Sequence, residues 1–337
     1  MNSLQRLNAL LQGHPVDRVP NFDIFMTRAA HHIGAPLSTY YLDQRVLCQA
    51  NLAVWQDFGL DILQAISDPY REAADIGLEV EFPTDGLPLS RKPLLLEPQD
   101  LGGLRFPLKD FGRRMTDRLE GVRNLRARGG EEVPVMGWVE GALAEACDLR
   151  GMNNVMMDLY RRPAWLKELL EACTQVAIAF ACAQIEAGAH LVGLGDAVAS
   201  QVSPRMYREF ALPYEQRIFA AIRARGGVGR LHICGNTTHL LKDMAQSGAE
   251  IVDIDWMVDM RQAVADLPGR LVCGNLDPVA VFLQGSPEQV RLGVRANAEA
   301  ARPHWISAAG CEIPDGTPAE NLHAQGQALR ELAEPVA

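Results

Sequence analysis

Short apolar runs alternate with helical segments along most of this chain, and this alternation restricts the fold more than any other feature. Most of the runs are near-continuous stretches of Val, Ile, Leu and Ala, as expected for parallel strands buried on both faces. Eight strands are predicted, at residues 18–25, 60–67, 133–140, 190–197, 229–234, 250–255, 270–275 and 305–309. Helical spacing of apolar residues lies between several of them, for example over 163–188. The pattern predicts an α/β fold of the (β/α)8 TIM-barrel type.

Two segments depart from the alternation. Residues 2–12 have the pattern of a helix, which we expect to pack outside the barrel as an N-terminal extension. Residues 70–128 are less regular and predict an insertion after the second strand, with strands near 78–82 and 104–107. No linker or low-complexity segment divides the rest, so residues 1–337 are expected to form a single barrel domain.

Three residues stand where predicted strands become loops: His232, Cys234 and Cys311. Active sites of TIM barrels lie at the C-terminal ends of the strands. His232 and Cys234 are two residues apart, so both can face the same side of a strand. Cys311 follows the last strand, which neighbours the first when the barrel closes. Two thiolates and an imidazole suit Zn²⁺ with its fourth position open, although both cysteines could instead be ordinary buried side chains.

The types of the three candidate ligands favour some zinc-dependent reactions over others. Two thiolates place negative charge on the metal, which weakens it as a Lewis acid for hydrolysis and keeps a bound thiolate nucleophilic. A site of this composition therefore favours activation of a thiol or another soft nucleophile.

Charge and hydropathy exclude other classes of protein. The formal net charge of -10 argues against binding to nucleic acid, and it gives no attraction to anionic membranes. The first residues lack the pattern of a signal peptide, and no apolar run reaches the roughly 18 to 20 residues that span a bilayer. We expect a cytoplasmic protein, with a homodimer as one option for its assembly.

Several motifs closely resemble the uroporphyrinogen decarboxylase superfamily, and more narrowly its zinc- and corrinoid-dependent methyltransferase branch. The resemblance covers essentially the whole chain, and its strongest segments are 231–236 (LHICGN), 274–278 (GNLDP), 310–314 (GCEIP) and 317–321 (TPAEN). The decarboxylases carry an Arg-Gln-Ala-Gly-Arg type motif whose arginines hold substrate carboxylates. The matching stretch here, residues 26–32, keeps only Arg28, which favours the methyltransferase branch.

The resemblance implies a reaction. His232, Cys234 and Cys311 would bind zinc, and the zinc would activate a small methyl acceptor such as a thiol or tetrahydrofolate. The methyl group would come from methylcobalamin held on a separate corrinoid protein. Four alternatives stay open: transfer from a methylated substrate onto cob(I)alamin, a decarboxylase of the uroporphyrinogen type, a non-catalytic zinc barrel that binds a partner protein, and thiol methylation from a donor other than a corrinoid.

Other polar residues are candidates for supporting roles. Glu140 is a candidate catalytic residue, as a labile fourth zinc ligand or a proton acceptor, and Asp196 is another as polar lining of the mouth. Asn275, Tyr214 and Asp68 are candidates for binding the cofactor or lining the pocket. For each of the five, a structural role in capping, ion pairing, loop hydrogen bonding or core packing is the alternative.

Overall fold

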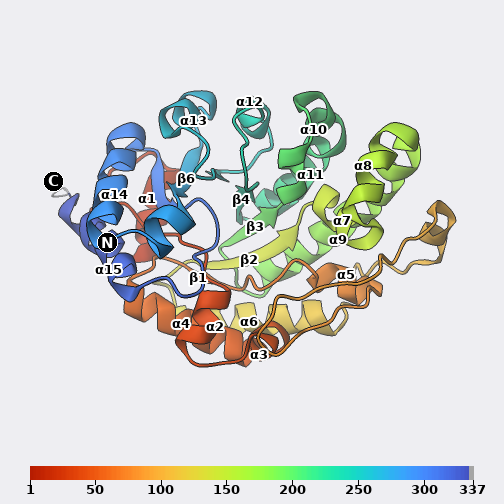
Figure 1. Ribbon diagram of the computed structural model, residues 1–337, viewed down its shortest axis with the longest axis horizontal. Coiled ribbons are helices and arrows are strands. Elements are labelled where there is room, and N and C mark those ends of the chain that lie inside the picture. The colour runs from red at the N-terminus through yellow and green to blue at the C-terminus, as the bar shows by residue number, and fades with distance from the viewer. Residues whose placement is uncertain (334–337) are drawn as a thin grey trace.

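The computed structural model describes residues 1–333 and contains one curled, parallel sheet of seven strands with helices around it (Figure 1). The strands lie side by side in sequence order: β1 (Leu63–Gln64), β2 (Val135–Glu140), β3 (Leu191–Gly195), β4 (Val228–His232), β5 (Ile251–Asp253), β6 (Leu271–Leu276) and β7 (Trp305–Ala309). Sequential parallel strands joined by helices are the arrangement of a TIM-type barrel, with which this sheet is consistent.

The predicted first strand, residues 18–25, is not a regular strand. Asn21 forms an isolated parallel bridge with Ser307 of β7. Phe22 N donates to Ser307 O at 2.8 Å, and on the other side Asp61 N donates to Asn21 O at 2.9 Å. The segment therefore lies between β7 and the residues that lead into β1. Pro20 has no N–H to donate, which limits the ladder that this segment can form.

The helices follow the predicted alternation closely. Their bounds are α1 (Ser3–Leu11), α2 (Thr27–His32), α3 (Leu37–Leu42), α4 (Gln44–Phe58), α5 (Arg71–Ile76), α6 (Arg113–Gly129), α7 (Ala142–Arg150), α8 (Met152–Arg161), α9 (Pro163–Glu186), α10 (Pro204–Phe210), α11 (Leu212–Ala224), α12 (Leu241–Met244), α13 (Met260–Asp266), α14 (Pro287–Ala301) and α15 (Ala319–Glu331). Short 3-10 helices occupy Pro98–Gly103 and Ala197–Gln201, and a π-helix occupies Pro278–Leu283.

Helix α9 corrects one expectation from the sequence. By length and composition alone it could cross a membrane, although we expected no such segment. Here 56% of its most apolar stretch is buried inside the protein, and α9 packs against α11 and β2. This burial matches a core helix of the barrel.

The irregular segment between β1 and α6 contains little of the predicted strand structure. Residues 78–82 contribute only Glu81, in an isolated antiparallel bridge with Leu89, and residues 104–107 form no strand. The remainder is α5, the 3-10 turn at Pro98–Gly103 and loops.

Alternate residues of the strands divide into two apolar clusters, as a period of two requires. The outward-facing residues pack against the helices. The inward-facing ones, such as Met136, Trp138 and Ile306, pack with Leu7 and Leu10 of α1. Helix α1 thus contributes to the same cluster as the inside of the sheet.

Candidate metal centre

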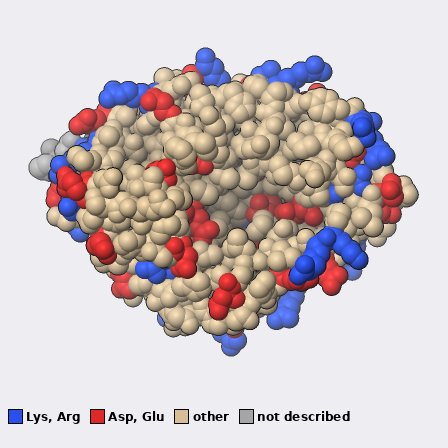
Figure 2. Space-filling model, in the orientation of Figure 1, with Lys and Arg blue, Asp and Glu red and all other residues tan. Residues whose placement is uncertain are grey.

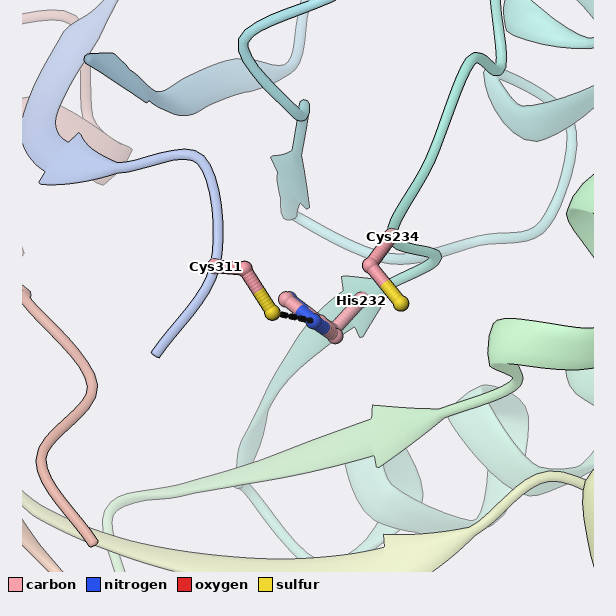
Figure 3. A group of neighbouring side chains, drawn as sticks. All are labelled: His232, Cys234 and Cys311. Atoms are coloured by element: carbon pink, nitrogen blue, oxygen red, sulfur yellow. Dashed lines mark hydrogen bonds between the residues drawn. The ribbon is translucent and has the colours of Figure 1, made fainter. Parts of the chain in front are cut away.

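His232, Cys234 and Cys311 come together at the C-terminal ends of the strands. Their ligand atoms all lie within 4.8 Å of one another, and His232 Nε2 is 3.9 Å from Cys311 Sγ. Figure 3 shows His232 at the end of β4, Cys234 in the loop just after it, and Cys311 reaching in from the loop after β7. Zinc bonds of about 2.0 to 2.3 Å require ligand atoms roughly 3.5 Å apart in a tetrahedron, so small movements would complete this set. The donor types and their spacing fit zinc.

Two glycines shape the loops that carry the cysteines. Gly235 has φ +90°, a left-handed conformation that turns the chain directly after Cys234. At Gly310 a Cβ would lie 2.5 Å from Trp256 N, so only glycine allows the loop before Cys311 to pass this close to the loop after β5. The conformations of these two loops therefore fix the positions of the Cys234 and Cys311 thiols.

Asp253 of β5 orients the imidazole. The register pairs His232 with Asp253, and His232 Nδ1 lies 2.8 Å from Asp253 Oδ2. Arg230 Nε donates to Asp253 Oδ1 at 2.8 Å. With Nδ1 engaged by the carboxylate, Nε2 faces the cysteines, which is the arrangement that supports a metal-bound imidazole.

The protonation of the three groups reflects this contact. Burial opposes the charged imidazole, but the hydrogen bond to Asp253 and the neighbouring Cys311 raise the pKa of His232 to about 10. Cys311 lowers the pKa of the Cys234 thiol, and its own pKa is raised by Cys234 and by burial. Metal binding must therefore displace protons from this cluster.

The metal cluster borders a cavity of about 150 Å³ that opens on one face. Figure 2 shows a hollow near the centre of this face with acidic side chains on its walls. The cavity is lined by Ile24, Met26, Ile66, Asp68, Pro69, Trp138, Glu140, Gly195, Ala197, His232, Cys234, Cys311 and Glu312. Apolar surface and carboxylates therefore surround the position where a substrate would meet the metal.

Glu140 and Asp68 lie on this wall, each with an arginine behind it. Glu140 Oε1 accepts from Arg71 Nη2 at 2.8 Å and from Trp138 Nε1 at 3.0 Å. Burial raises the pKa of Glu140 to about 8, although Arg71 acts in the opposite direction. Asp68 accepts from Arg114 Nη2 at 2.5 Å, and although burial disfavours its charge, Arg114 and Arg71 hold its pKa below the usual value. Glu140 can thus change its protonation near neutral pH, whereas Asp68 stays ionised.

The other three candidates do not line the cavity. Asp196, predicted to line the mouth, is fully buried and accepts from Ala144 N at 2.9 Å in the first turn of α7. Tyr214 is buried in α11 among core residues. Asn275 Nδ2 donates to the carbonyls of Asp255 and Val258, which fixes the loop after β5. Because Asp255 Oδ2 accepts from Gly235 N at 2.6 Å, Asn275 supports the chain next to Cys234 indirectly.

Sequence reasoning missed Asp253 and Arg230. Both lie inside predicted strands, where charged residues give no obvious sign of function. The two-residue period offers the missing signal, because Arg230 and His232 share a strand face and Asp253 is the partner of His232 in the register. The Sγ of Cys273 in β6 accepts from Arg230 Nη2 at 3.6 Å, so this buried cysteine belongs to the same support.

Arg28 does not reach the cavity. Its Nε donates to Thr317 O at 3.3 Å, and its guanidinium lies 6.0 Å from the ring centroid of Phe58. The single arginine left in the 26–32 stretch is therefore bound elsewhere. Residues 1–333 place no lysine or arginine in the lining of the metal cavity.

Comparison with known proteins agrees with this architecture. A family model described as uroporphyrinogen decarboxylase (URO-D) matches residues 2–332. The methylcobamide:CoM methyltransferase MtbA of Methanosarcina mazei is 29% identical over 328 residues, covering 94% of each chain. A uroporphyrinogen decarboxylase of Anaeromyxobacter dehalogenans is 29% identical over 341 residues, covering 95% of this chain and 96% of that protein. The solved structure of a methyltransferase from Methanosarcina mazei has a TM-score of 0.89 and 25% identity, covering 98% of this chain and 99% of the other.

The chain belongs to the uroporphyrinogen decarboxylase family. The resemblance of its motifs to the methyltransferase members of that family is confirmed by these relatives.

Proposed function

We propose that this protein is a zinc-dependent methyltransferase that moves a methyl group from methylcobalamin, carried by a corrinoid protein, to a thiol. The observation that carries the proposal is the His232, Cys234 and Cys311 cluster, which opens into a cavity. The similarity to a methylcobamide:CoM methyltransferase over 94% of the chain supports the same class of reaction. Zinc held by these residues would lower the pKa of the acceptor thiol and leave its sulfur nucleophilic.

The protein's own residues account for the remaining steps. Asp253 holds the His232 imidazole with Nε2 toward the cysteines. The acceptor S–H bond breaks, and the proton passes to the Glu140 carboxylate, whose pKa of about 8 suits a base near neutral pH. The methylcobalamin of the corrinoid protein would supply the methyl group to the thiolate sulfur, and the electron pair of the broken cobalt–carbon bond would stay with the corrinoid. The apolar walls formed by Trp138 and Ile66 limit water around the reacting sulfur.

A porphyrinogen decarboxylase is disfavoured by the cavity. Its substrate carries several carboxylates, which require cations, whereas the charged lining residues other than the metal cluster are Asp68, Glu140 and Glu312. Decarboxylation would also leave the His232, Cys234 and Cys311 cluster without a role.

Elemental analysis combined with a visible-spectrum assay tests the proposal. Wild-type protein should contain about one zinc per chain and demethylate methylcobalamin when a thiol is added. The Cys311→Ser variant should lose both properties. Cys182→Ser is the matched control, since Cys182 is a free cysteine in α9, outside the cavity lining. Wild-type protein without zinc, or a Cys311→Ser variant with full activity, would contradict the proposal.

A further inference from the structure

We infer that the acceptor thiol of this protein is small and carries no negative charge apart from its sulfur. The inference rests on the proposed function and specifies its substrate class: a thiol whose remainder is uncharged or cationic.

The charges around the cavity carry the inference. Beyond the metal cluster, three ionisable side chains line it, Asp68, Glu140 and Glu312, and all three are acidic. Among residues 1–333 the lining includes no lysine or arginine that could pair with a sulfonate or carboxylate, and the imidazole of His232 is already engaged by Asp253 and the cysteines. A buried anion without a counter-ion is costly. Asp68, which stays ionised on the same wall, increases that cost for a second anion.

The arginines behind the wall are already committed. Arg114 is bound to Asp68, and Arg71 is bound to Glu140 and lies 3.7 Å from Glu72. Arg71 is fully buried and has N–H groups without a protein partner, but its charge is balanced by these two glutamates. Drawing either arginine toward a substrate anion would leave a buried carboxylate unpaired. Neither can act as a free cationic subsite.

The wall instead offers an acceptor. Glu140 Oε1 takes both hydrogen bonds recorded for this carboxylate side chain, from Arg71 and Trp138. Its Oε2 takes part in no hydrogen bond within the described chain, and Glu140 lines the cavity. An ammonium or hydroxyl group near the acceptor sulfur could donate to this oxygen, whereas an anionic group could not. The small volume, about 150 Å³, and the apolar side chains Ile66 and Trp138 suit a short carbon chain.

Three thiols with the same two-carbon chain differ in the charge of their terminal group: 2-mercaptoethanol, 2-aminoethanethiol and 2-mercaptoethanesulfonate. Each is titrated into protein loaded with Co²⁺ in place of zinc, and the thiolate-to-cobalt absorption band reports binding. Affinities are expressed per concentration of thiolate, because the three thiols ionise at different pH. The uncharged and cationic thiols should bind at least about tenfold more tightly than the sulfonate, the effect of one like charge near a protein surface.

Variants locate the source of the discrimination. Glu140→Gln keeps the shape of the side chain. Measured above pH 8, where Glu140 is ionised, it should reduce the discrimination against the sulfonate severalfold. Glu209→Gln is the matched control, because Glu209 pairs with Lys167 at the surface and does not line the cavity. It should leave the order of affinities unchanged.

Other outcomes separate this inference from the proposed function. The expected order of binding without demethylation of methylcobalamin would support the inference and reject the transfer reaction. Demethylation fastest with the sulfonate would support the reaction and overturn the inference, as would failure of all three thiols to bind. A neighbouring cavity of about 400 Å³ shares Glu140 and contains Lys92. Sulfonate preference that disappears in Lys92→Ala would also overturn the inference and place the anion there.

Discussion

Two buried clusters of charged side chains border the cavity, and they differ in how completely they are hydrogen-bonded. The ligand cluster (Arg230, His232 and Asp253) has a partner for every side-chain nitrogen and oxygen. The wall cluster (Asp68, Arg71, Glu72, Arg114 and Glu140) leaves Arg71 Nε and Nη1, Glu72 Oε2 and Arg114 Nε without a hydrogen-bond partner in the described chain.

This difference indicates a division of roles. A fully satisfied network fixes one geometry, which suits residues that orient a metal ligand. A network with unused hydrogen-bonding capacity can adjust when a substrate or a proton arrives. The ligand cluster should therefore control metal affinity, and the wall cluster should control the reaction and its pH dependence.

Glu140→Gln should give the largest effect specific to the wall cluster. Without a carboxylate to accept the thiol proton, kcat/KM for demethylation should fall by about 100-fold or more. Zinc content should stay at the wild-type level, because Glu140 is not one of the three ligands. Loss of zinc in this variant would make Glu140 a metal ligand and break the proposed division.

Asp253→Asn should give the complementary result. Replacing the carboxylate removes the hydrogen bond that orients His232, and zinc affinity should fall by about 10 to 100-fold. Competition with a chromogenic chelator measures this change. Asp259→Asn serves as the control, because Asp259 caps α13 and does not touch the metal cluster. Unchanged zinc affinity in Asp253→Asn would remove the ligand cluster from metal binding.

The pH profile sharpens the comparison through Arg71. As a base, Glu140 must be ionised, so activity should rise with pH through about 8 and fall below it. Arg71 lowers the pKa of Glu140, so Arg71→Lys, which shortens the cation, should move this limb to higher pH by about one unit. If the rise in activity with pH stays at the same pH in Arg71→Lys, a group other than Glu140 controls it. Circular dichroism checks that this buried substitution preserves the fold.

The smallest effect should come from a site remote from both clusters. Ser286 caps α14 in a reciprocal capping box with Gln289. Ser286→Ala should lower the free energy of unfolding by about 1 kcal/mol in urea denaturation. Zinc content and the pH profile should be unchanged; a change in either would mean that general destabilisation perturbs the cavity.

The sequence predicted the parts of the molecule that local patterns specify. Strands β2 to β7 all overlap predicted runs because their buried residues form continuous apolar stretches. The run over residues 18–25 gave the same signal but forms only a bridge at Asn21, since strand pairing depends on neighbours that the run does not encode. The metal cluster was predictable because two of its members share a strand face.

The wall cluster was harder to predict, because its members come together only through contacts that local sequence patterns do not encode. Arg71 and Arg114 flank the irregular segment after β1 and reach the cavity wall only through tertiary packing. Asp196 was assigned to the mouth from its position at the end of a predicted strand. β3 does end beside it, at Gly195, but its side chain accepts from Ala144 N at the N-terminus of α7 and does not line the cavity. A position at a strand end indicates the region of a site, whereas side-chain direction depends on the next helix.

The packing of α1 bears on the order in which the acceptor thiol and the methyl carrier bind. Leu7 and Leu10 join the inward-facing residues of the sheet, so apolar side chains of the described chain pack the barrel interior on the side of α1. Under the proposed reaction, the small acceptor and the large methyl carrier must use the same opening. A carrier seated over that opening would exclude the acceptor, so the thiol should bind first. Steady-state kinetics should then show compulsory order, with the carrier unable to form a productive complex ahead of the thiol.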